Sequence, residues 1–214
     1  VGFAALIAAP VGRAASAVGQ AIMWATELQP FFMGIIVSVV IGVALTLPIS
    51  SAAICAALGL TGLAGGAAVA GCCAQMIGFA VMSFPENRWG GLAAQGLGTS
   101  MLQMGNIVRN PRVWIPPTLA SAITGPVATC LFRLEMNGAP VSSGMGTCGL
   151  VGQIGVYTGW VSDVASGAKA AITGMDWLGL VLISFMLPAV LTWLIAIPLR
   201  KWGWIKDGDL KLDL

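Results

Sequence analysis

The chain contains no histidine, and only 8% of its residues are charged. Without an imidazole there can be no Ser-His-Asp or Cys-His catalytic arrangement, so hydrolytic and redox chemistry of those kinds is excluded and no catalytic residue is predicted. The shortage of charge excludes a soluble domain. A soluble chain of 214 residues needs a charged exterior, and ten Lys and Arg with eight Asp and Glu cannot cover one.

Motifs for nucleotides, nucleic acids and metals are also missing. The chain has no Gly-x-x-x-x-Gly-Lys-(Ser/Thr) sequence and no dinucleotide fingerprint, and its net charge of +2 forms no basic stripe. Its five cysteines lie in apolar or Gly-rich runs, which is typical of packing residues: Cys55, Cys72, Cys73, Cys130 and Cys148. A redox or metal pair at Cys72-Cys73 would need histidine or a second Cys pair at metal-ligand spacing. We therefore expect no cofactor, no metal and no nucleic-acid partner.

The residues that are present indicate an integral membrane protein. Hydrophobic residues make up 57% of the chain, and no Asp, Glu, Lys or Arg occurs between Glu27 and Glu86. That interval is long enough for two crossings of about 20 residues each. Because helices satisfy their backbone hydrogen bonds internally, the sequence predicts an all-α, polytopic membrane domain over residues 1–214.

Four apolar segments predict transmembrane helices at residues 31–58, 63–84, 114–132 and 177–199. Residues 14–29 predict an interfacial amphipathic helix or, equally, the end of an earlier transmembrane helix. Pro48, Ser50 and Ser51 interrupt the first span, and we expect this break to line a functional interface, since lipid cannot satisfy the freed backbone groups. The Gly- and Ala-rich second span suits close helix packing and allows a homodimer without requiring one.

Two Gly-rich segments, 91–104 and 144–160, do not fit the spanning pattern and predict re-entrant or broken helices. They also resemble each other, because Gly-Leu-Gly-Thr-Ser at 96–100 parallels Gly-Met-Gly-Thr-Cys at 144–148. The match is short, so an internal repeat and a chance match both remain open. Re-entrant segments would place three arginines, Arg88, Arg109 and Arg112, on the same side as Arg13 and the Arg200-Lys201 pair. The positive-inside rule makes that side cytoplasmic. Residues 200–214 then form a solvated cytoplasmic tail.

Seven blocks of the sequence resemble one family: residues 24–30, 47–53, 71–80, 94–103, 106–121, 149–155 and 203–214. The family is a divergent group of bacterial phosphotransferase-system membrane components of the IIC type. Its members carry a further apolar N-terminal part, so the resemblance implies a piece covering about the C-terminal two thirds of the family chain. It also implies a multi-pass protein of the bacterial cytoplasmic membrane, a sugar permease whose soluble partner phosphocarriers supply the phosphate.

One motif of better-studied sugar-specific IIC proteins, a Gly-Ile-Thr-Glu type sequence, does not occur in this chain. Three functions therefore stay open. The first is a phosphotransferase-type permease that moves a small polar solute, with a sugar as the expected solute. The second is a membrane sensor or regulator with a transporter-like fold, and the third is a solute transporter that is not coupled to phosphorylation.

The solute-binding residues are predicted from their chemistry and position. Uncharged hydrogen-bonding groups at membrane depth suit a sugar, which needs many donors and acceptors and little charge, while neighbouring glycines let the backbone approach it. Hydrogen bonding between helices is the structural alternative. The predicted residues are Gln75, Glu86, Asn87, Gln95, Thr99, Ser100, Gln103, Asn106, Thr147 and Gln153.

Overall fold

The computed structural model describes the backbone of residues 2–212 and the side chains of residues 12–212. Within this range every regular element is a helix, as predicted, apart from an isolated β-bridge between Gly62 and Met136. The α-helices are α1 Gly2–Leu28, α2 Pro30–Thr46, α3 Ser51–Leu58, α4 Gly62–Met82, α5 Phe84–Ala93, α6 Met104–Arg109, α7 Ile115–Pro126, α8 Pro140–Ser143, α9 Val151–Ala165, α10 Gly174–Val181 and α11 Leu187–Lys201. The 3-10 and π segments are η1 Ala94–Gly98, η2 Ser100–Gln103, η3 Pro111–Trp114, η4 Val127–Leu131, η5 Cys148–Leu150 and η6 Leu182–Met186.

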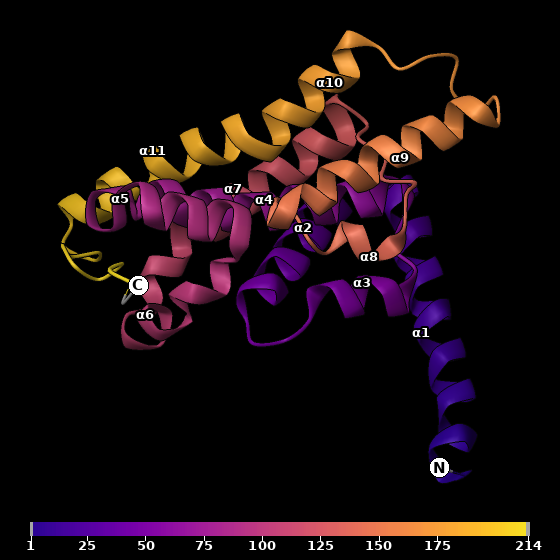
Figure 1. The fold of residues 1–214 in the computed structure, drawn as a ribbon, viewed down its shortest axis with the longest axis horizontal. Helices are drawn as coiled ribbons and strands as arrows, with labels where there is room; N and C mark the ends of the chain where they lie inside the picture. The colour runs from indigo at the N-terminus through magenta and orange to yellow at the C-terminus, as the bar shows by residue number, and fades with distance from the viewer. Residues whose placement is uncertain (1, 213–214) are drawn as a thin grey trace.

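Helix α4 lies at the centre of a bundle formed with α2, α7 and α11 (Figure 1). Nearly all of its residues are buried, because its glycines and alanines let the neighbouring backbones come close. At Gly71, a Cβ would overlap the carbonyl oxygen of Ser38 on α2. Ser38 Oγ in turn donates to the carbonyl of Ser121 on α7 at 2.8 Å, and Gly34 packs against Gly125. These pairs make α7 antiparallel to α2.

Within the part of the chain that the structure describes, two helices are long and apolar enough to cross a membrane by length and composition. They are α4, with a mean hydropathy of 1.6, and the continuous helix Gly174–Lys201, with a mean hydropathy of 2.5. Helix α2 is apolar but shorter. The predicted span 31–58 is divided into α2 and α3, and α3 runs back beside α2 after the break at residues 47–50 (Figure 1). Residues 14–28 belong to the 27-residue helix α1, which projects away from the bundle, and Gln29 is the N-cap of α2.

Residues 84–109, here called the first hairpin, leave the end of α4, turn at Thr99 and return to the same end of the bundle. Thr99 is extended, with φ −158° and ψ 143°, and it separates η1 from η2. Gly96 packs on Ile77 and Ala80 of α4. The predicted re-entrant segment 91–104 therefore contains the turn and the inner parts of both limbs.

Residues 132–165, the second hairpin, enter from the opposite end of the bundle. Their first limb begins beside Gly62, through the bridge to Met136, and reaches Cys72 at Gly146. The chain then turns and returns as α9, whose Gly155 packs on Ser142 of the first limb. The predicted segment 144–160 holds the turn and most of the return limb.

The C-terminal tail differs from the expectation of a solvated segment. Ile205 and Leu210 are buried, with exposed fractions of 1% and 0%, against Phe79 and Ile107. That expectation is wrong for these residues, because their apolar side chains pack into a pocket formed by α4 and the first hairpin. Among the cysteines, Cys55, Cys72 and Cys73 are buried as expected, whereas Cys130 is exposed.

Candidate functional site

The tips of the two hairpins meet beside the break between α2 and α3. We call residues 96–100 the first tip and residues 144–150 the second tip; η1 of the first contacts η5 of the second. A cavity of about 430 Å³ opens at this meeting point. Its walls come from all three parts: Leu45, Pro48, Ile49, Ser50, Ser51 and Ala52 from the break, Thr99 and Met101 from the first hairpin, and Met145 and Cys148 from the second.

Hydrogen bonds stabilise both sides of the break, and on the α2 side Leu47 N donates to the Val43 carbonyl at 3.1 Å. Ser50 caps α3, because its Oγ accepts a hydrogen bond of 3.1 Å from Ala53 N. Ser51 is buried and donates from Oγ to the carbonyl of Gly144 at 2.7 Å, which joins α3 to the second tip. Residues 48–50 are exposed at the mouth of the cavity. Ile49 N donates to the Leu47 carbonyl at 2.7 Å, and the Ser50 carbonyl accepts from Ile54 N at 3.0 Å.

The second tip has a strained backbone. Gly146 and Gly149 have φ values of 53° and 51°, and Leu150, which has a Cβ, has φ 60°. A left-handed leucine costs about 1–3 kcal/mol and persists only where its surroundings enforce it, most often at functional sites. Gly146 is required for another reason as well, since a Cβ there would lie 2.7 Å from that of Cys72.

No charged residue lines the cavity. The polar groups on its walls are the hydroxyls of Ser50, Ser51 and Thr99 and the thiol of Cys148, and the remaining walls are apolar. A site without a charged group offers no counter-ion to an ionised solute, and desolvating an unpaired ion is very costly. The cavity therefore suits a small uncharged molecule that has both hydroxyl and apolar faces.

A buried hydrogen-bond network around Gln75 supports the first tip. The Oε1 atom of Gln75 accepts from Thr46 Oγ1 at 3.3 Å and from Trp114 Nε1 at 3.0 Å. Its Nε2 atom donates to Thr118 Oγ1 at 3.3 Å. Thr46 then pairs with Ser100 at 2.8 Å. Gln75 and Ser100, both predicted to bind solute, are fully buried and instead connect α4 to α2, α7 and the tip.

Four predicted amides lie on the limbs of the first hairpin, away from the cavity walls. Gln103 Nε2 donates to Gln95 Oε1 at 2.9 Å, and Asn106 Nδ2 donates to Gln103 Oε1 at 2.8 Å. Asn87, Gln103 and Asn106 also bind backbone atoms of the C-terminal tail. These amides are paired with one another and with the tail.

The other predicted residues are separated from this group. Thr147 is buried on the second tip with Oγ1 3.5 Å from Met76 Sδ. Gln153 on α9 donates to Ser184 Oγ at 3.0 Å, and its buried Oε1 has no partner. Glu86 forms an ion pair of 2.9 Å with Arg200, not with its neighbour Arg88. Of the ten predicted residues, Thr99 alone is in the cavity wall.

Sequence reasoning had marked the break at Pro48, Ser50 and Ser51 but not Met101, Met145 or Cys148. The two methionines lie next to the residues of the repeated Gly-x-Gly-Thr pattern or within it, so that pattern was the available signal. Within residues 12–212, no three His, Cys, Asp or Glu side chains gather closely enough to hold a metal ion.

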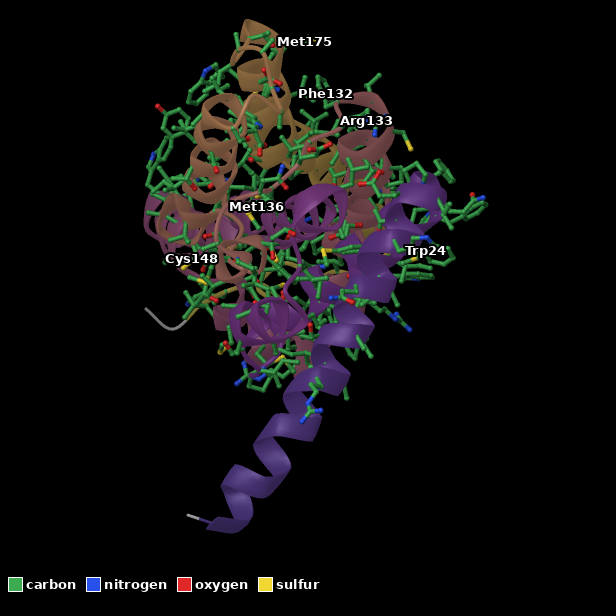
Figure 2. All side chains as sticks on the ribbon, turned by 90° about the vertical axis from the view of Figure 1, so that its right-hand side faces the viewer. Trp24, Phe132, Arg133, Met136, Cys148 and Met175 are labelled. Atoms are coloured by element: carbon green, nitrogen blue, oxygen red, sulfur yellow. The ribbon has the colours of Figure 1, made fainter. Side chains whose placement is uncertain are left out.

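Charge differs between the two ends of the bundle. The end with the first hairpin and the tail carries seven of the ten Lys and Arg residues: Arg88, Arg109, Arg112, Arg200, Lys201, Lys206 and Lys211. The opposite end has a cavity of about 350 Å³ lined by Arg133 and Lys169 with Glu135, Asp163 and Asp176. Figure 2 looks onto this second end and shows Phe132, Arg133 and Met175 of the same cavity close together.

Comparison with known proteins gives a family and no close relative. A family model described as phosphotransferase system, EIIC, matches residues 1–212. No curated protein and no solved structure matches the chain. Because the family model covers nearly every residue, the chain belongs to the EIIC family of phosphotransferase-system membrane components.

Proposed function

We propose that the chain is the solute-binding and translocating part of a phosphotransferase-system transporter and that a small uncharged solute, a sugar in the first instance, binds between the two tips. The observation that carries this proposal is the convergence of three interrupted segments on one cavity without charge. Broken helices and re-entrant hairpins that meet inside a bundle are how many transporters build their substrate site.

The proposed site has two parts with different roles. Thr99, Ser50 and Ser51 supply hydroxyl groups, and Met101 and Met145 supply an apolar wall. The amides Gln75, Gln95 and Gln103 hold the first hairpin in place behind the wall. Gln153, whose Oε1 lacks a partner, and Thr147 position the second hairpin from behind in the same way.

We place the protein as a multi-pass component of the bacterial cytoplasmic membrane. The end rich in Lys and Arg is then cytoplasmic by the positive-inside rule, and the end with Glu135, Asp163 and Asp176 faces outward. Exposed apolar side chains such as Phe32 on α2 and Trp193 on α11 face lipid. Both hairpins are re-entrant in this orientation, one from each side.

Phosphate transfer depends on partners in this scheme. The chain has no histidine to carry a phosphoryl group. A soluble phosphocarrier docks at the cytoplasmic end and phosphorylates the solute that the cavity delivers. Sensing without transport and transport without phosphorylation are the competing functions.

Cys148 lines the cavity, so the reactivity of its thiol can report whether a solute is bound there. In a chain with Cys148 as the sole cysteine, we expect a membrane-permeant maleimide to react and a bound solute from a panel of mono- and disaccharides to slow the reaction. A matched chain with only Cys130, which is exposed and does not line the cavity, should react at the same rate with and without solute. Equal slowing at both positions, or none at Cys148 with any member of the panel, would contradict the proposed site.

Vesicles distinguish the three functions. With phosphoenolpyruvate and the soluble phosphotransferase proteins outside inverted vesicles, a coupled permease releases phosphorylated sugar into the outer medium. An uncoupled transporter releases unmodified sugar. A sensor releases neither but still shows solute protection of Cys148.

A further inference from the structure

The C-terminal segment 204–212 is seated against the first hairpin at its open end. The side chain of Leu210 is fully buried in a cluster with Phe79, Met82 and Ile107. Ile205 enters the same cluster. Gly203 and Gly208, with φ values of 71° and 94°, allow the turns that bring this segment back from α11.

Side-chain amides from both limbs of the hairpin bind the backbone of this segment. On the entering limb, Asn87 Nδ2 donates to the Leu210 carbonyl at 2.7 Å, while Asn87 Oδ1 accepts from Leu212 N at 2.8 Å. On the returning limb, Gln103 Nε2 donates to the same Leu210 carbonyl at 3.1 Å. One carbonyl oxygen thus joins two limbs that are otherwise held together by Gln95 and Gln103.

Two further amides extend the row. Asn106 Nδ2 donates to the Lys211 carbonyl at 2.9 Å, and Asn110 Nδ2 donates to the Trp204 carbonyl at 2.9 Å. A side-chain amide has the donor and acceptor of a peptide group, so such a row recognises extended or turned backbone regardless of most side chains. Leu210 and Ile205 add side-chain specificity by burial, and Asp209 adds it through Oδ2, which accepts from Asn110 Nδ2 at 2.8 Å. Lys206, Asp207 and Lys211 are exposed.

We propose that this surface is a peptide-binding site occupied by the chain's own segment 204–212, and that the bound segment clamps the two limbs of the first hairpin and thereby fixes the first tip. The clamp reaches the tip through Gln103, which is bonded to Gln95 next to Gly96. It goes beyond the proposed transport function, because it concerns the mobility of the hairpin and needs no solute.

The test is hydrogen exchange, measured by mass spectrometry on the chain in lipid nanodiscs. Two variants release the segment in different ways. One chain ends at Trp204. The other is Asn87→Asp in the full chain, which keeps the acceptor for Leu212 N but places a carboxylate oxygen against the Leu210 carbonyl. The control is Lys206→Ala, which changes an exposed side chain and leaves the amide contacts of the segment intact.

In both releasing variants we expect amides at 94–104 to exchange about tenfold faster or more, because the hairpin opens locally more often, while α4 keeps its slow exchange. Lys206→Ala should match the unchanged chain. A synthetic peptide of residues 205–212, added to the chain that ends at Trp204, should restore slow exchange, and the same peptide carrying Leu210→Asp should not.

Three results would overturn the proposal. The first is a released segment with unchanged exchange at 94–104, which would show that the segment does not restrain the first hairpin. The second is slow exchange of residues 204–212 in Asn87→Asp, which would show that the Asn87 amide is not needed to hold the segment. The third is equal rescue by both peptides. If the shortened chain fails to fold, Asn87→Asp decides the question, because it alters one atom of an intact chain.

Discussion

Replacing Gln75 by methionine tests whether the buried network behind the first tip is held by this one amide. Methionine keeps the length and approximate volume of the side chain but removes its acceptor and donor. Three of the groups around it retain other partners: Thr46 keeps Ser100, and Thr118 and Ser121 keep carbonyls of α7 or η3. Trp114 Nε1 donates only to Gln75 in the structure and loses that acceptor.

The loss of stability in Gln75→Met follows from the one donor that loses its partner, Trp114 Nε1. A buried donor without a partner costs about 1–3 kcal/mol, so we expect Gln75→Met to destabilise the protein by about 2 kcal/mol. Trp114→Phe removes the donor itself, and in the Gln75→Met background it leaves nothing unsatisfied. The double variant should therefore be less destabilised than the sum of the two single variants by about 1–2 kcal/mol.

The assay is the midpoint of thermal unfolding of the purified protein, with all four members of the cycle measured in the same detergent. For a chain of this size, about 2 kcal/mol corresponds to a loss of about 4–8 °C in Gln75→Met. Additive effects of the two substitutions would show that Trp114 does not depend on Gln75. An unchanged midpoint in Gln75→Met would refute the network as a source of stability.

Two further predictions concern packing and orientation. Gly71→Ala places a Cβ against the backbone of α2, so it should abolish folding or lower the unfolding midpoint by more than about 10 °C, the scale of a severe core clash. Gly105→Ala is the control, because a Cβ there meets nothing within 4 Å and should leave the midpoint unchanged. Equal midpoints of the two variants would contradict the close packing of α2 on α4. Each of three variants carries a single cysteine, introduced by Arg109→Cys, Lys206→Cys or Ala168→Cys. The first two should react with an impermeant thiol reagent only from the cytoplasmic side, and the third only from outside. Labelling of all three from one side would refute the proposed orientation.

The helices were predictable because the signals for them are local. Absence of charge marked α4, and Pro48 with the following serines marked the end of α2 and the start of α3. The glycine-rich segments showed where a helix could not continue, and both contain a turn. Their outer limits were missed, because α5 and α9 extend each hairpin beyond the segment marked by the repeated pattern.

The partners of the buried amides could not be predicted in this way. Gln103 binds a carbonyl 107 residues away at Leu210, and Asn87 binds one 123 residues away. An amide shows the same chemistry in the sequence whether it binds a sugar hydroxyl, a second amide or a peptide carbonyl. The tail was misjudged for a related reason, since its charged residues suggested solvation, whereas the pocket that buries Ile205 and Leu210 exists only in the folded chain.

The order of elements places the two similar glycine-rich sequences at the two tips. A helix followed by a hairpin occurs twice, as α4 with the first hairpin and as α7 with the second. Because α4 and α7 run antiparallel, with Thr118 beside Gln75 and Ser121 beside Gly71, the hairpins enter from opposite ends and their tips meet between them. Each tip packs on α4, where only a glycine allows the approach that Gly146 makes to Cys72. At the second tip a Cβ on Gly144 would also lie 2.5 Å from the Ser51 carbonyl oxygen, so packing requires glycine there as well. At the first tip a Cβ on Gly96 would make ordinary contacts, and one on Gly98 would meet nothing within 4 Å. Close packing therefore accounts for the glycines of the second tip and not for those of the first.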